Sequence, residues 1–255
     1  MSELLFHYCP TQSFHSIVSN KSILLSSLTL SNDSMEGTLA TSKLQKRIKA
    51  IPNYTERSRI EKDVELIEKM SDGLGFCLTA GGGDQLNQWR GYADDGHGFS
   101  IGFSKDYLSE EIKTVENPYF SSISFEEVLY SDAAHEFELT PILESLTAMR
   151  SQSLGINSPE FPALVKQLMR SRFRIKNKAF NEEKEWRLFV SLIKKDRLPK
   201  QIQYRASRSG LIPHLEYKFD QPKGVIKQVF IGPKNRTPEY AVRSFMELNG
   251  FGFVE

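Results

Sequence analysis

The sequence is poor in cysteine and contains no long apolar run. Only two of its 255 residues are cysteine, Cys9 and Cys77, and each lies inside a short apolar stretch. Two isolated thiols do not make a disulfide framework and are typical of a reducing compartment, so we expect a cytoplasmic protein. No run of roughly eighteen apolar residues occurs, and the first residues lack the charged-then-apolar pattern of a secretory signal. We therefore expect no membrane span.

Several motifs of catalysis and ligand binding are also missing. The triple glycine Gly81–Gly83 is not followed by Lys-Ser/Thr, and no Gly-x-Gly-x-x-Gly spacing occurs, so we predict a mobile loop rather than a phosphate cradle. A Ser–His–Asp triad would lack the Gly-x-Ser-x-Gly elbow that marks many hydrolases. No set of His, Cys and carboxylate residues has metal-ligand spacing, and we therefore expect no metal site.

The small net charge of +1 hides an uneven distribution along the chain. Residues 166–208 contain fourteen Lys or Arg and four Asp or Glu, so the remainder of the chain is acidic. Such segregation suits a polyanion, and the segment predicts a nucleic-acid or protein acceptor. A solvated helix surface is the alternative interpretation.

Hydrophobic residues make up 39% of the chain, an ordinary share for a globular protein. The pattern predicts strands and helices in separate blocks rather than in regular alternation, which indicates an α+β fold. We expect a single domain over 1–255, with helical insertions at about 36–70 and 133–178. Short strands are predicted at 4–9, 22–30, 75–79, 99–103, 185–192, 202–205, 214–219 and 225–231.

The most informative strand begins at Glu185. The apolar side chains of Trp186, Leu188, Val190 and Leu192 alternate along it and predict a core-facing side. Glu185 and Arg187 then stand on the opposite, open side, with Glu183 next to them at the mouth of the strand. Two carboxylates and a cation on one side of a sheet suit the binding of a polar substrate, and they also suit a solvated ladder of charges.

Three further positions carry candidate functional side chains. His7 lies on a short strand and shares a face with Leu5 and Cys9, where a satisfied core histidine and a ligand contact are both reasonable interpretations. Trp89 and Tyr92 are three residues apart on a predicted helix over 85–93, so we expect them on one side of it. They are either core anchors or aromatic groups that stack on a ligand.

The ordered set of motifs resembles a known family. Its members are Phe6-His7-Tyr8, Asn32-Asp33-Ser34-Met35-Glu36-Gly37, Trp89-Arg90-Gly91-Tyr92-Ala93, Gly98-Phe99-Ser100-Ile101-Gly102-Phe103, Glu183-Lys184-Glu185-Trp186-Arg187 and Ile231-Gly232-Pro233-Lys234. The set resembles the widespread prokaryotic domain-of-unknown-function family twenty-nine seventy-one. That family usually has Asn-Asp-Pro where this chain has Asn32-Asp33-Ser34, so we expect a less rigid turn here.

The layout also looks like the ADP-ribosyltransferase fold, which implies a split, mainly antiparallel β core and NAD as the substrate. In that superfamily a His or Arg on the first strand, a Ser, Thr or Tyr on the second and a Glu on a late strand bind NAD. His7 matches the first position, Ser26 or Ser27 the second, and Glu185 the third. Glu183 and Glu185 together look like the Glu-x-Glu signature of members that modify side chains.

The resemblance implies a role for each residue. Glu185 would bind the ribose 2′-hydroxyl and stabilise the developing positive charge, Glu183 would orient or deprotonate the acceptor, and His7 would hold a ribose. Tyr8, Tyr92 or Trp89 would stack on nicotinamide, and Arg90 would meet the diphosphate. Ser26 and Ser27 are the remaining candidates for NAD binding.

We thus expect an NAD-dependent ADP-ribosyltransferase, acting as a toxin or antiviral defence effector on protein or nucleic acid. Two other functions remain open. The first is a non-catalytic accessory or sensor module that binds a nucleotide or nucleic acid, and the second is an RNA- or DNA-processing enzyme of another mechanism.

Overall fold

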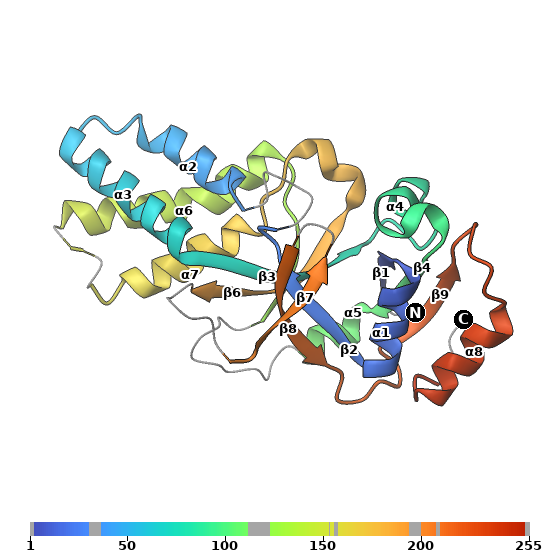
Figure 1. Ribbon diagram of the computed structural model, residues 1–255. Coiled ribbons are helices and arrows are strands. Elements are labelled where there is room, and N and C mark those ends of the chain that lie inside the picture. Colours follow the sequence, from blue (N-terminus) through green and yellow to red (C-terminus); the bar gives the residue numbers. More distant parts are fainter. Residues whose placement is uncertain are drawn as a thin grey trace.

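Antiparallel strands form one curled sheet in the computed structural model, and helices gather at its two ends (Figure 1). The structure describes residues 3–30, 37–111, 123–152, 154–155, 158–193, 200–207 and 210–252. The expected α+β fold class is confirmed. The strands are β1 (Leu4–Cys9), β2 (Ser22–Ser27), β3 (Ser71–Thr79), β4 (Phe99–Ser104), β5 (Ser124–Glu127), β6 (Glu185–Ile193), β7 (Ile202–Ser207), β8 (Gly210–Lys218) and β9 (Ile226–Ile231).

The sheet has the order β7-β8-β2-β3-β1-β4-β9, and β6 joins β3 and β5 outside this path. The helices are α1 (Thr11–Asn20), α2 (Leu39–Ile48), α3 (Tyr54–Met70), α4 (Leu86–Tyr92), α5 (Lys105–Glu111), α6 (Asp132–Ser151), α7 (Phe161–Arg172) and α8 (Glu239–Leu248), with short 3₁₀ helices at η1 (Asp94–Gly96) and η3 (Lys178–Glu183). None of the helices within the described ranges is both long and apolar enough to cross a membrane.

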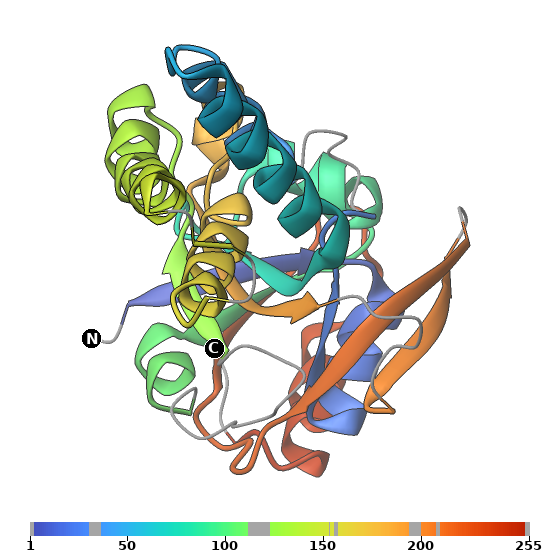
Figure 2. The ribbon, with the colours of Figure 1, turned by 90° about the vertical axis from the view of Figure 1, so that its left-hand side faces the viewer.

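Helices α2, α3, α6 and α7 pack against one another beside the sheet, at the left of Figure 1 and the top of Figure 2. Leu44, Ile60, Leu139 and Leu168, one from each helix, are fully buried in the cluster that they share. Apolar residues at helical spacing thus form a second core, separate from that of the sheet. These helices lie where the sequence predicted insertions. The first insertion was predicted to begin at about residue 36, and its first helix, α2, begins at Leu39 and ends at Ile48. The predicted turn at Asn32-Asp33-Ser34 lies outside the described residues.

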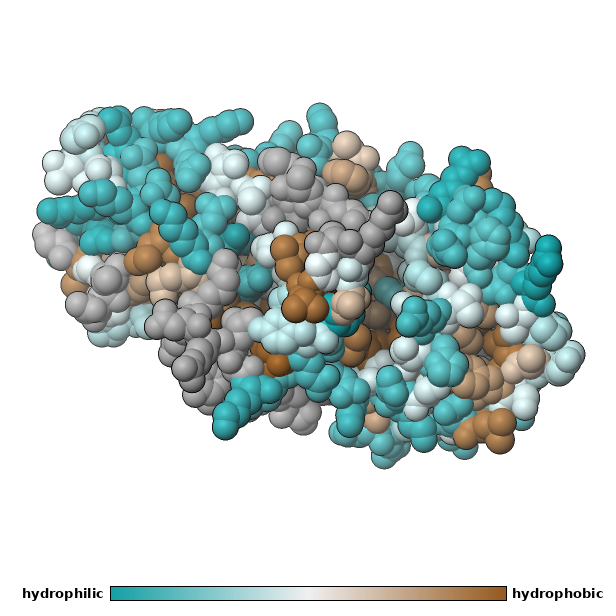
Figure 3. Space-filling model, viewed as in Figure 1, coloured by the Kyte–Doolittle hydropathy of each residue, from teal (hydrophilic) through white to brown (hydrophobic). Residues whose placement is uncertain are grey.

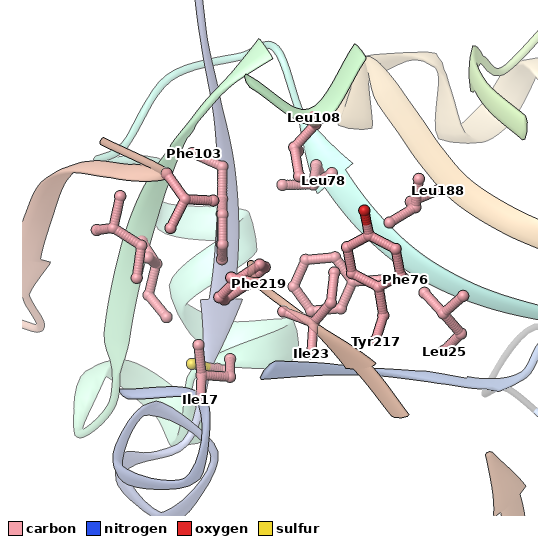
Figure 4. Packing of buried hydrophobic residues seen from close by; sticks show 14 of the residues in the cluster. Ile17, Ile23, Leu25, Phe76, Leu78, Phe103, Leu108, Leu188, Tyr217 and Phe219 are labelled. Atoms are coloured by element: carbon pink, nitrogen blue, oxygen red, sulfur yellow. The ribbon is translucent and has the colours of Figure 1, made fainter. Parts of the chain in front are cut away.

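The larger core lies on the other face of the sheet, under α1, α5 and α8 (Figure 4). Phe76 and Leu78 of β3 pack there with Leu188 of β6, and Tyr217 and Phe219 complete this part of the cluster. The alternation predicted for β6 is therefore confirmed. The strand predicted at Gly75–Thr79 is longer than expected and begins at Ser71.

The opposite face of β6, which the sequence predicted to be open, is covered. Phe173, directly after α7, packs on this face against Phe189 and Leu28. A Cβ atom added at Gly73 would lie 2.7 Å from the Phe173 ring, so the glycine permits this close approach. As a result Glu185 and Arg187 are 5% and 1% exposed, and the interpretation as a solvated ladder of charges is wrong.

The sheet parts at one edge of β3. β6 pairs with β3 from Ser71 to Thr79, which leaves the other edge of β3 to two different strands. On that edge β2 pairs at Leu74 and Gly75, whereas β1 pairs at Thr79, so Cys77 lies between the two strands. On the face shown in Figure 3 the surface is hollowed between the β7–β8 hairpin and the part that contains α1 and α4.

Candidate active site

An ionic network occupies the start of β6. The Lys176 ammonium donates to Glu183 Oε2 at 2.6 Å and to Glu185 Oε2 at 2.8 Å. The Arg187 guanidinium holds the same Glu185 carboxylate through Nε at 2.6 Å and Nη2 at 2.9 Å. The thiol of Cys77 also hydrogen-bonds to Glu185. Glu185 thus has partners on both carboxylate oxygens, and all of them come from the chain itself.

The network keeps its members charged. Burial alone would raise the pKa of Glu185, but Arg187 and Lys176 outweigh it and lower that pKa to about 2. Burial alone would lower the pKa of Lys176, and the two carboxylates raise it above its usual range instead. Glu185 and Lys176 are therefore both ionised at neutral pH.

Glu183 is the member of this network closest to solvent. Its side chain is 16% exposed, compared with 6% for the side chain of Glu185. The Tyr92 hydroxyl at the end of α4 donates to Glu183 Oε1 at 2.9 Å, and Tyr92 as a residue is 44% exposed. Burial and the Glu183 charge raise the pKa of Tyr92, so the phenol stays protonated and donates. The network thus comes closest to water at Glu183 and Tyr92.

A turn of the backbone between Glu183 and Glu185 brings both carboxylates to Lys176. Glu183 ends the 3₁₀ helix η3, and Lys184 then turns the chain with a left-handed φ of 42° into β6. The Thr79 hydroxyl donates to the Glu183 carbonyl at 2.6 Å, and the Ala80 N–H donates to the Lys184 carbonyl at 2.9 Å. The carboxylates therefore converge through a turn, and not along one side of a strand as the sequence predicted.

His7 lies away from this network. Paired residues of antiparallel strands share a face, so Phe6, Thr79 and Glu185 lie on one face of the sheet and His7 on the other. The His7 ring stacks on Phe76 with centroids 4.1 Å apart. Its Nδ1 donates to the Cys77 carbonyl at 2.9 Å. Burial lowers the pKa of His7 to about 4, so the ring is neutral. The structure does not bring His7 and Glu185 together.

Tyr8 and Trp89 form part of a small cluster on the Glu185 face. They are 4% and 3% exposed, and their ring centroids lie 4.9 Å apart. Trp89 packs into this cluster, whereas Tyr92, three residues later on α4, reaches Glu183 instead. Neither Tyr8 nor Trp89 offers an open ring face to a ligand.

The triple-glycine loop is anchored rather than mobile. The Tyr8 hydroxyl donates to the Gly82 carbonyl at 2.9 Å and accepts from the Gln85 N–H at 2.8 Å. Gly83 is buried, and a Cβ atom there would lie 2.2 Å from the Phe230 ring. The loop therefore has a fixed path beside Glu183, which the sequence did not predict.

The other candidate residues, Ser26, Ser27 and Arg90, lie at separate places around the ionic network. Ser26 pairs with Gly75 and so lies on the Glu185 face, whereas Ser27 points to the other face and hydrogen-bonds to Asp72 at 3.2 Å. Arg90 is exposed on α4. Of these three residues, Ser26 shares the sheet face of Glu185, and Arg90 shares the helix of Tyr92.

Five of the fourteen basic residues of 166–208 make contacts within the protein. Arg170 and Arg174 pair with Glu126, and Arg174 also pairs with Glu138, both from outside the segment, whereas Lys176 and Arg187 pair with the two glutamates of the segment itself. Arg172 is buried and donates to the Gly37 carbonyl. These basic residues hold α7 and β6 in place instead of presenting an open basic surface.

Two residues of the site, Lys176 and Tyr130, were not predicted from the sequence. Lys176 stands in a run of basic residues after α7, and nothing in that run distinguishes it from Arg174 or Lys178. Tyr130, whose hydroxyl accepts the Glu185 N–H at 3.0 Å, follows the end of β5. Across the described residues no group of three or more His, Cys, Asp or Glu side chains is placed to hold a metal ion.

The comparisons with known proteins identify one family. The sequence model of a family described as "Protein of unknown function (DUF2971)" matches residues 88–188, and the resemblance noted from the motifs is confirmed over this segment. Tyr92, Tyr130, Lys176, Glu183, Glu185 and Arg187 all lie inside it. No curated protein and no solved structure gives a significant match.

Proposed function

We propose that this protein transfers ADP-ribose from NAD at Glu183 and Tyr92, where the ionic network comes closest to water. One observation carries the proposal: a partly exposed carboxylate stands two residues before a buried one and is joined to it by Lys176. Loss of nicotinamide leaves positive charge on the ribose, so the reaction needs an ionised carboxylate held next to the sugar. The parted antiparallel sheet and the Glu-x-Glu order agree with this chemistry.

The geometry favours a division of roles between the two glutamates. Glu183 is partly exposed and would contact the ribose or the acceptor, whereas the saturated Glu185 would fix Lys176 and Arg187 in place. Tyr92, the exposed aromatic residue next to Glu183, would lie against the nicotinamide ring, and Arg90 would meet the diphosphate. Nicotinamide leaves with the electron pair of its C1′–N bond, the acceptor forms the new bond to C1′, and Glu183 accepts the acceptor's proton.

Nicotinamide release from NAD tests the proposal, with the protein alone and with cell lysate or RNA added. Glu183→Gln should lower the rate about a hundredfold, the usual effect of losing one charge-stabilising group. Glu182→Gln is the matched control, because Glu182 is the adjacent glutamate and is exposed. Equal rates for the two variants, or no release by the wild type under any condition, would refute the proposal.

A second candidate is a non-catalytic module that binds a nucleotide or nucleic acid. The saturated carboxylate of Glu185 favours it, because a group with its own partners on every side is typical of a structural brace. This candidate predicts that NAD or a nucleotide raises the melting temperature without nicotinamide release. Binding to RNA that is lost at moderate salt would point to nucleic acid as the ligand.

A further inference from the structure

The segment Val128–Tyr130 connects the two main-chain stretches that carry the ionic network. The Val128 N–H donates to the Glu185 carbonyl at 2.9 Å, and the Glu185 N–H donates to the Tyr130 hydroxyl at 3.0 Å. On the other side the Lys176 N–H donates to the Leu129 carbonyl at 3.0 Å. The position of Lys176 relative to Glu185 thus depends on where Leu129 lies.

A histidine of α6 fixes that carbonyl. His135 Nε2 donates to the Leu129 oxygen at 2.7 Å, so this oxygen accepts from both His135 and Lys176. His135 is 2% exposed, and its ring also lies against the backbone of Lys176. Burial lowers the pKa of His135, which keeps the ring neutral with one N–H available for Leu129.

Among the described residues, no charged group that faces His135 lies at hydrogen-bond distance from its ring. Its Nδ1 is 4.0 Å from Asp132 Oδ1, and Asp132 is itself bonded to Lys43 of α2 at 2.6 Å. The hydrogen bond to Leu129 and the contact with the Lys176 backbone therefore orient the ring, and α6 carries this orientation to the site.

We propose that His135 is a positioning residue that sets Lys176 between Glu183 and Glu185. Without its N–H the Leu129 carbonyl loses one of its two donors, and the hold on the Lys176 backbone is weakened, while the Leu129 N–H still donates to the Arg174 carbonyl at 2.6 Å. The ammonium then leaves the carboxylates, and Glu183 loses the partner that orients it. The effect on turnover rests on the proposed function, whereas the effect on Lys176 does not.

Two variants separate the hydrogen bond from the bulk of the ring. In His135→Gln the side-chain amide nitrogen reaches the place of Nε2 and keeps the donor, whereas His135→Leu fills a similar volume without it. Acylation of lysines is followed by mass spectrometry, with the exposed Lys178 as the internal reference. Lys176 should be protected in the wild type and in His135→Gln, and should react at least tenfold faster in His135→Leu.

Turnover gives the second readout. The kcat for nicotinamide release should fall about tenfold in His135→Leu with little change in KM, and His135→Gln should restore it. Protection of Lys176 that is the same in all three proteins would overturn the proposal. If no protein releases nicotinamide, the proposed function fails, and the reactivity of Lys176 still decides the role of His135. Should His135→Leu fail to fold, His135→Asn, whose shorter amide does not reach Leu129, takes its place with the same expected outcome.

Discussion

His7 Nδ1 donates a hydrogen bond to the Cys77 carbonyl across 2.9 Å, at the point where β1 and β2 part along the edge of β3. Gly75 of β3 pairs with β2 and Thr79 pairs with β1, and Cys77 lies between these two positions. The His7 side chain bonds to the Cys77 carbonyl where a neighbouring strand would otherwise pair. Stacking on Phe76 fixes the ring in this position. His7 therefore bridges the parted strands and faces away from the carboxylates.

Removal of this bridge should destabilise the protein without affecting the carboxylate site. His7→Leu should lower the free energy of unfolding by about 1–3 kcal/mol, because a buried carbonyl loses its donor. His7→Asn, which keeps an N–H near the position of Nδ1, should recover part of the loss. Urea denaturation measures both values. A nicotinamide-release rate that falls in His7→Leu as far as in Glu183→Gln would contradict this assignment.

The same histidine makes stability depend on pH. Its pKa is about 4 in the folded protein and about 6.5 in the unfolded chain, so the unfolded chain binds the proton more readily. The contribution of His7 is fully present above about pH 6.5 and is lost as the pH falls towards 4, by up to about 3 kcal/mol. Urea denaturation between pH 7.5 and 4.5 should show the difference between wild type and His7→Asn shrinking as the pH falls. A constant difference would refute this account.

The two glutamates should differ in their effect on stability. Glu185→Gln leaves Lys176 and Arg187 with an uncharged partner inside the protein, and breaking such a buried network costs about 3–5 kcal/mol. Glu183→Gln keeps a polar group next to water and should cost no more than about 1–2 kcal/mol. Thermal denaturation at equal protein concentration compares them. Equal losses would mean that Glu185 is less buried in solution than the structure shows.

The anchored glycine loop gives a prediction that is independent of charge. Gly83→Ala places a methyl group 2.2 Å from the Phe230 ring and 2.7 Å from that of Phe6, and such overpacking costs about 1–3 kcal/mol. Gly91→Ala is the matched control, since nothing lies within 4 Å of a Cβ atom there. In α4 that change should be neutral or should stabilise the protein by up to about 1 kcal/mol. The two melting temperatures should therefore shift in opposite directions or by clearly different amounts.

Local patterns along the chain determined the elements and their buried sides. The apolar residues of β6 alternate with period two, and those of α3 recur at helical spacing, so each buried side followed from the residues of one segment. The α+β class followed in the same way from the order of the blocks. The sequence also singled out Glu183, Glu185 and Arg187 as candidates, because these charged residues occupy every second position at the start of one predicted strand.

The tertiary structure alone decided which groups meet and which face is covered. Lys176, Tyr130 and His135 reach the site from three other segments, and contacts between distant segments leave no local period in a sequence. Cover by Phe173 turned the predicted open face of β6 into a buried one, and the pairing of β1 with β3 placed His7 opposite Glu185. The register of strand pairing sets the face of every side chain, and it is formed between segments rather than within one.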